Sequence, residues 1–351
     1  MPPIRGIPRA VLVAPDSFKG TMSARDVAQA LGAGLEAAGV EVDLCPVADG
    51  GEGTLEALMA PLEAEPRTAT VSDPLGRPIE APFAVTPPDG PRRRRATPVT
   101  GIVEVAAASG LGRVAEGERD AIAATTFGTG ELILAAVHAG AELVYVGVGG
   151  SATTDGGAGA IRAIRDGGGL QGARLVVLCD VRTPFEDAAR VFGPQKGAGE
   201  RDVHRLTSRL HGLARGFARD PRGIAMTGAA GGLSGGLWAE FGAELAPGAG
   251  YVLDAIDFDR RMRAARAVVG GEGKLDEQSL AGKAVAEVAT RARQAGVPCF
   301  AVVGRAELDS FGARMLDLQA VLEAGTPAAL RRAGGQLARL VWSSQVGRGA
   351  D

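Results

Sequence analysis

Histidine and excess positive charge are both lacking in this sequence. Only three histidines occur among 351 residues, and His138, His204 and His211 sit in helical or surface settings without a paired partner. A Ser–His–Asp hydrolase is therefore excluded. The formal net charge is −3 and no basic face is evident, which argues against nucleic acid as a partner. The basic run at residues 92–95 follows a turn at 87–91 and is expected to be an exposed loop.

Cysteine and long hydrophobic runs are scarce as well. Cys45, Cys179 and Cys299 are far apart, odd in number, and set in or beside apolar segments. This usage predicts reduced thiols in a cytoplasmic protein, without a disulfide framework. The N-terminus shows no signal-peptide core, and no apolar run reaches about 18 residues, so no membrane span is expected.

Glycine, in contrast, is abundant, with 53 residues. The glycines cluster between periodic segments, as they do in loops where the backbone approaches a ligand closely. A coding bias toward Gly, Ala and Arg contributes too. The length favours two domains.

The chain begins with a βαβα pattern. Residues 10–14 and 40–44 read as strands, and Ser23 is expected to cap the helix between them, with Asp26 as its capping-box partner. The loops after both strands leave the same edge of a parallel sheet, so Lys19, Asp49 and Glu52 are expected to share a crevice.

The same pattern recurs near the end of the chain. Strands are expected at 174–179, 265–269 and 297–303, whereas residues 70–118 read as antiparallel strands and loops. The sequence therefore predicts an α/β protein with a discontinuous first domain, residues 1–68 plus 265–351. A second, mixed α/β domain with glycine-rich loops, residues 69–264, is inserted into it.

The most informative segment is the glycine-rich stretch 147–160, between an expected strand and an expected helix. Glycines let backbone N–H groups surround a phosphate, and a helix N-terminus adds a favourable dipole. Ser151, Thr153, Thr154 and Asp155 supply oxygens suited to a magnesium–nucleotide complex. The segment matches neither GxxxxGK[ST] nor GxGxxG.

Three other loops carry candidate chemistry, each with a structural alternative. Residues 270–283 hold acids and lysines, but could be a solvated helix start; residues 192–198 present Lys196, but could be a surface turn. Residues 227–237 could contact phosphate or only pack a helix on a sheet. Asp155 and Asp180, at the exits of buried strands, are candidates for magnesium or for a general base. The turn at 125–126 is expected to cap a helix.

Taken together, these loops resemble the bacterial glycerate kinase family, of the type found in glycerate and glucarate catabolism. The matching motifs, in family order, are residues 14–20, 46–54, 147–157, 179–181, 192–198 and 271–283. The resemblance implies ATP-dependent phosphorylation of D-glycerate, usually at the 2-position, with the 3-phosphate as the alternative product. It also implies two α/β domains, one flavodoxin-like, with the active site in the cleft between them. Residues 180–185 and 87–97 depart from the family pattern.

Combining the motifs with the sheet-edge argument assigns candidate roles. The catalytic candidates are Asp180 (favoured as base), Lys19, Asp49 and Lys283. The ATP-binding candidates are Gly149, Gly150, Ser151, Thr153, Asp155, Lys196, Gly231 and Gly232. The substrate-binding candidates are Ser17, Lys19, Glu52, Glu272, Asp276 and Gln278. Mg²⁺ is expected at Asp155 or Asp180.

Two other classes remain open at this point. A dinucleotide-dependent oxidoreductase or transferase would need GxGxxG after the first strand, and residues 14–20 do not supply it. A non-enzymatic small-ligand binding protein would show ligand-induced stabilisation without turnover. The partners expected are D-glycerate, with no nucleic acid and no membrane, and the assembly a monomer or homodimer.

Overall fold

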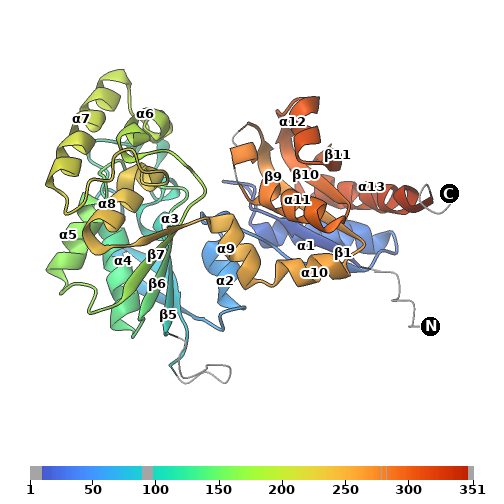
Figure 1. Cartoon of the computed structure of the whole chain (residues 1–351), viewed down its shortest axis with the longest axis horizontal. Helices are drawn as coiled ribbons and strands as arrows, with labels where there is room; N and C mark the ends of the chain where they lie inside the picture. The colour runs from blue at the N-terminus through green and yellow to red at the C-terminus, as the bar shows by residue number, and fades with distance from the viewer. Residues whose placement is uncertain (1–9, 89–97, 278, 282, 347–351) are drawn as a thin grey trace. The chain divides into compact units, whose positions relative to one another are not determined.

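The computed structural model describes residues 10–88, 98–277, 279–281 and 283–346 (Figure 1). The chain forms two compact α/β units. Unit 1 combines Met1–Ala48 with Val252–Asp351, and unit 2 is Asp49–Tyr251. The predicted α/β class, with one discontinuous parallel sheet and an inserted mixed domain, is confirmed.

The borders of the units differ from the expected 68/69 and 264/265. Residues 49–68 belong to unit 2, where the backbone N–H of Leu55 donates to the Glu104 carboxylate at 2.7 Å. Residues 252–264 belong to unit 1, where Asp259 pairs with Arg291 at 3.3 Å. Local βα periodicity looks the same in both domains, so it did not reveal which sheet each segment joins.

Unit 1 is built on a parallel five-stranded sheet of order β11-β10-β9-β1-β2. Its strands are β1 (Val11–Pro15), β2 (Val42–Leu44), β9 (Ala267–Leu275), β10 (Cys299–Ala306) and β11 (Leu318–Glu323). Numbered along unit 1 alone, this order is 2-1-3-4-5, that of flavodoxin-like folds. The flavodoxin-like prediction is confirmed at the level of topology.

Helices cover both faces of this sheet. They are α1 (Ala24–Ala37), α10 (Phe258–Ala264), α11 (Ala284–Ala295), α12 (Ser310–Met315) and α13 (Pro327–Val346). Helices α1 and α13 lie side by side and share one core with Val11, Val13 and Val302. On the other face, a Cβ added at Gly270 would lie 3.4 Å from Val285 of α11. Burial on both faces explains why β1 and the first part of β10, inside the sheet, are continuous apolar runs.

One strand is longer than expected. The sequence predicts a strand at 265–269 followed by a loop, but β9 continues to Leu275. Its ladder with β10 runs from Val268 to Leu275. At Gly271 a Cβ would lie 2.5 Å from the carbonyl oxygen of Val302, so this glycine permits close strand packing and does not mark a loop.

The first helix begins where its cap predicts. The Ser23 hydroxyl accepts the Asp26 N–H at 3.1 Å and donates to the Asp26 carboxylate at 2.8 Å. We expect Ser23→Ala to lower the free energy of unfolding of unit 1 by about 1 kcal/mol, because an N–H of the first turn loses its partner. Urea unfolding would measure the change. The exposed, mid-helix Ser208→Ala is the control, and an equal loss there would contradict the capping role.

Unit 2 contains a mixed six-stranded sheet of order β3-β4-β5-β6-β7-β8. Its strands are β3 (Glu65–Ser72), β4 (Pro78–Val85), β5 (Thr100–Glu104), β6 (Leu143–Gly147), β7 (Arg174–Leu178) and β8 (Glu244–Ala246). β3, β4 and β5 pair antiparallel, as the turn-rich segment predicted, and β5 to β8 pair parallel. The carboxyl ends of β5, β6 and β7 therefore lie along one edge.

The helices of unit 2 are mostly short. They are α2 (Thr54–Met59), α3 (Val105–Ser109), α4 (Phe127–His138), α5 (Ala158–Asp166), α6 (Ala188–Phe192), α7 (Glu200–Gly216) and α8 (Leu233–Phe241); α9 (Gly248–Ala255) contains the border with unit 1. α4 packs on α5 over the main core, which includes Leu132, Ile133 and Val146. Among the described residues, no helix is both long and apolar enough to span a bilayer.

The three cysteines are free and buried. Burial raises the pKa of each thiol to about 12, so all three stay protonated near neutral pH. A role as nucleophile is excluded for them.

Candidate functional site

The topological switch point of unit 1 lies between β1 and β9. Ligands of open parallel sheets bind outside the carboxyl ends of the strands at such a point. The loop after β1 carries Asp16, Ser17 and Lys19, and the end of β9 carries Glu272 and Asp276. The structure thus brings two of the predicted motifs together at one edge.

The loop after β1 is held tightly to β9. The Asp16 N–H donates to the carbonyl of Gly271 at 2.8 Å, and the Asp16 carboxylate accepts the Ser17 N–H at 2.6 Å. A Cβ at Gly273 would lie 3.4 Å from the Lys19 nitrogen. Asp16 and Ser17 are buried whereas Lys19 is exposed, so Lys19 is the charged residue of this loop that a solute reaches.

Lys283 stands between two acids of β9 and the turn that follows. Its Nζ lies 3.8 Å from a Glu272 carboxylate oxygen and 3.8 Å from an Asp276 oxygen. Both distances are longer than a hydrogen bond, so the ammonium is shared loosely between the acids. Lys283 is the N-cap residue of α11, and its side chain is 26% exposed. Gln278 lies outside the described residues.

In unit 2, the glycine-rich segment after β6 packs against the 49–53 turn. A Cβ at Gly149 would lie 2.4 Å from the Gly51 Cα, and one at Gly147 would lie 3.0 Å from the Gly50 carbonyl oxygen. These glycines let two backbones meet. Gly150, with φ +71°, is exposed and remains the candidate for approach by a phosphate.

The 49–53 turn carries two of the predicted acids. One Asp49 carboxylate oxygen accepts the Gly51 N–H at 3.1 Å, and Glu52 is exposed. Gly50 and Gly53 adopt φ of +83° and +97°, which explains the two glycines of this turn. The turn belongs to unit 2, whereas Lys19 belongs to unit 1.

The Asp155 carboxylate binds backbone and side-chain donors from two segments of unit 2. Its carboxylate accepts the Thr126 N–H and hydroxyl, each at 2.9 Å, and the N–H groups of Gly157 and Gly159, each at 3.1 Å. It thereby joins the start of α4 to the start of α5, and only 6% of it is exposed. Its oxygens are occupied by donors, which does not fit a magnesium ligand.

Lys196 lies beneath the same glycine-rich segment. It is 2% exposed, and its ammonium donates to the Ser151 hydroxyl at 3.0 Å and to the Thr153 carbonyl at 2.5 Å. The 3-10 turn Pro194–Lys196 ends in Gly197 with φ +90°, which positions the side chain inward. Lys196 therefore supports the loop from within. Burial lowers its pKa to about 7, opposed by the nearby Asp155 charge.

The lowered pKa of Lys196 makes stability depend on pH. Between about 7 and its ordinary 10.5, the unfolded lysine binds a proton that the folded one lacks, so this residue makes the fold more stable as pH rises. We expect the free energy of unfolding of wild type minus that of Lys196→Met to increase by roughly 2 kcal/mol from pH 7 to 9. Chemical unfolding at both pH values measures it; a difference independent of pH would contradict the lowered pKa of Lys196.

The second glycine-rich segment, residues 227–237, packs against other parts of unit 2. A Cβ at Gly231 would lie 2.0 Å from the Thr153 carbonyl oxygen, and one at Gly232 would lie 2.7 Å from the Phe185 ring. Both glycines have positive φ and are buried. Within the described part of the chain, the buried hydroxyls of Thr153 and Thr154 have no hydrogen-bond partner. Gly231, Gly232 and the Thr153 side chain are therefore inner parts of this loop cluster.

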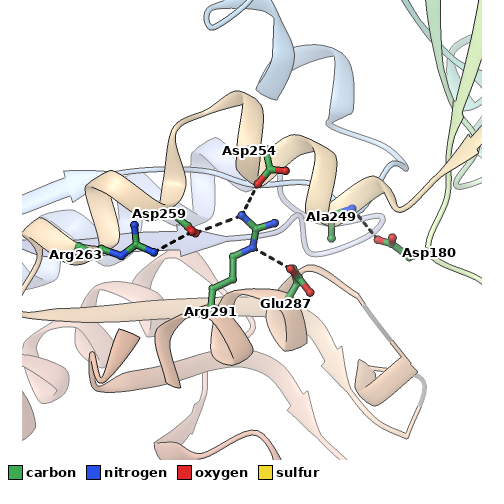
Figure 2. A network of polar contacts seen from close by, with 7 residues as sticks. All are labelled: Asp180, Ala249, Asp254, Asp259, Arg263, Glu287 and Arg291. Carbon is green, nitrogen blue, oxygen red and sulfur yellow. Dashed lines mark hydrogen bonds and ion pairs between the residues drawn. The ribbon is translucent and has the colours of Figure 1, made fainter. Parts of the chain in front are cut away.

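Asp180 follows β7 and meets the start of α9. Its carboxylate accepts the Ala249 N–H at 3.0 Å (Figure 2). A carboxylate at a helix N-terminus is stabilised in its charged form by the dipole. Figure 2 also shows Arg291 of α11, which binds Glu287 at 2.9 Å and Asp254 of α9 at 2.6 Å. Asp180 thus binds an N–H group at the start of α9, and Arg291 forms an ion pair with Asp254 near its end.

A metal site made of protein ligands alone does not form in the described residues, since no three His, Cys, Asp or Glu side chains come together suitably there. Mg²⁺ in phosphoryl-transfer enzymes commonly takes one or two carboxylates and completes its shell with phosphates and water. Of the two predicted ligands, Asp180 fits this mode better than Asp155.

The sequence reasoning missed Glu104. It ends β5, opposite Gly147 in the register, and is only 9% exposed. The available signal was a carboxylate in an otherwise apolar strand. A buried acid at the carboxyl edge of a sheet is a candidate for the site.

The fold and its loops define an α/β protein with polar groups collected at the carboxyl edges of two sheets. The glycerate kinase family model matches residues 11–166 and 168–340. A glycerate kinase from Halalkalibacterium halodurans is 35% identical over 84% of this chain and 85% of its own length. The glycerate 2-kinase of Escherichia coli is 36% identical, over 84% of each chain.

Structure comparison gives the same result. A glycerate kinase 2 from Salmonella typhimurium LT2 superposes with a TM-score of 0.75 and 32% identity, covering 96% of this chain and 99% of its own. The chain belongs to the glycerate kinase family.

Proposed function

We propose that this protein transfers the γ-phosphoryl group of MgATP to D-glycerate and forms 2-phospho-D-glycerate. Membership of the family supports a kinase that acts on glycerate, and a relative named glycerate 2-kinase favours the 2-position. The observation that carries the proposal is the Lys283 ammonium between Glu272 and Asp276 at the switch point of unit 1. A cation held loosely at a ligand edge is suited to exchange its partners for a phosphate or carboxylate.

Phosphoryl transfer depends mainly on positioning and on neutralising charge. We propose that Lys19 and Lys283 act on phosphate or on the substrate carboxylate, and that exposed Gly150 contributes to a phosphate cradle. Asp180 is the proposed base, with Asp49 as the alternative. Mg²⁺ would supply further neutralisation of phosphate, with Asp180 or Asp49 as its carboxylate ligand.

The direct test is ADP release in the presence of D-glycerate, with L-glycerate as a matched control. Coupling to enolase distinguishes the products, since the 2-phosphate reacts directly and the 3-phosphate requires a mutase. We expect turnover with D-glycerate and a signal without mutase. Absence of ADP release with D-glycerate and related hydroxy acids, together with ligand-induced stabilisation, would instead establish a binding protein.

A further inference from the structure

A buried carboxylate, that of Glu104, binds the end of the glycine-rich 49–53 turn of unit 2. Glu104 accepts the backbone N–H of Leu55 at 2.7 Å, and the N–H of Gly53 also bonds to it. Leu55 belongs to the first turn of α2, whose N–H groups have no partner within the helix. Glu104 therefore satisfies donors at the end of the turn that bears Asp49 and Glu52, and at the start of the helix after it.

The same turn is clamped from its other side. Glu104 lies opposite Gly147 in the β5–β6 register. A Cβ at Gly149 would not fit against Gly51, and one at Gly147 would lie tightly against Gly50. The turn thus rests on the end of β6 and is tied to the end of β5. Its position depends on both contacts.

We propose that Glu104 is a positioning residue, which fixes the 49–53 turn against residues 147–149 and thereby sets the place of Asp49 and Glu52. The inference rests on the proposed function, because it assigns Glu104 to the same loops. Glu104 itself acts through the backbone of Gly53 and Leu55 and not on the reacting atoms.

Burial and two neighbouring acids disfavour the charged form of the Glu104 carboxyl. Burial raises the pKa of its carboxyl to about 7, against the two backbone N–H groups that lower it, and Glu52 and Glu56 raise it further. An uncharged acceptor would bind the same N–H groups with a smaller desolvation cost. A buried acid whose environment opposes its charge is more common at functional sites than elsewhere.

The test combines amide exchange with kinetics. In Glu104→Ala we expect the amides of residues 53–55 to exchange at least about tenfold faster, and kcat/KM for D-glycerate to fall by roughly 10- to 100-fold, since small displacements of a site have effects of this size. Glu104→Gln keeps the acceptor and should restore both values to within about threefold. Glu104→Asp, one methylene shorter, should behave like the alanine variant.

Glu131→Ala is the matched control. Glu131 accepts the Ser72 N–H at 2.7 Å in the same unit, but it holds β3 and not a candidate loop. It should lower stability without changing KM or kcat beyond about twofold. Unchanged exchange in the aspartate and alanine variants would overturn the inference, as would a glutamine variant that restores exchange but not activity. If wild type lacks turnover, the proposed function fails, while exchange still reports on the anchoring.

Discussion

Lys283→Met is expected to lower kcat/KM for D-glycerate by about three orders of magnitude. Loss of one preorganised charge that stabilises a phosphoryl-transfer transition state has effects on the order of 10²- to 10³-fold or more. Methionine keeps the unbranched apolar stem and lacks only the terminal ammonium, and the backbone at the start of α11 is unaffected. The free energy of unfolding should also fall, because the Glu272 side chain is only 8% exposed and loses a nearby cation, although both ion pairs are long at 3.8 Å.

Lys274→Met is the control for Lys283→Met. Lys274 makes the same kind of contact, 3.4 Å from Asp276 and 2.7 Å from Glu307, but its side chain is half exposed. The hydrogen bond to Glu307 raises the pKa of Lys274, which marks it as a surface ion pair. Its substitution should leave kcat/KM within about threefold. Equal losses in both variants would contradict a specific role for Lys283, because both lysines contact Asp276.

The parts of the fold that depend on local pattern could be predicted from the sequence. The apolar run around Val11–Pro15 and the Ser23 cap identified β1 and the start of α1, because burial and capping leave signals within a few residues. The antiparallel pairing of β3 with β4 was signalled by turn residues. Parallel order followed from the βα alternation.

The roles of the glycines and acids were harder to predict, because their partners are distant in sequence. Gly231 must be glycine because the Thr153 carbonyl oxygen leaves no room for a Cβ. The Asp155 carboxylate already accepts hydrogen bonds from Thr126 and from its own loop. A glycine that admits a ligand and one that admits another backbone look identical in sequence. The same holds for a carboxylate that binds metal and one that binds N–H groups, so the assignment of Asp155 to magnesium is not retained.

Gly149→Ala should lower both the stability and the activity of the protein. Gly149 does not have positive φ, so alanine is compatible with its backbone conformation, and the effect comes from contact alone. The new Cβ would lie 2.4 Å from the Gly51 Cα, a main-chain atom that moves only if the turn moves. Such overpacking lowers stability by about 1–3 kcal/mol. Displacement of Asp49 and Glu52 should lower kcat/KM by on the order of 100-fold.

Gly212→Ala separates this contact from the general effect of adding a methyl group. Gly212 lies exposed inside α7, and an added Cβ there would have no atom within 4 Å. Alanine should stabilise this helix by roughly 0.5–1 kcal/mol and leave activity unchanged. Unfolding and ADP-release measurements on both variants decide the matter. A Gly149→Ala variant with wild-type kinetics would mean that the 49–53 turn takes no part in catalysis. The contact between Gly149 and Gly51 would then have been disturbed without consequence.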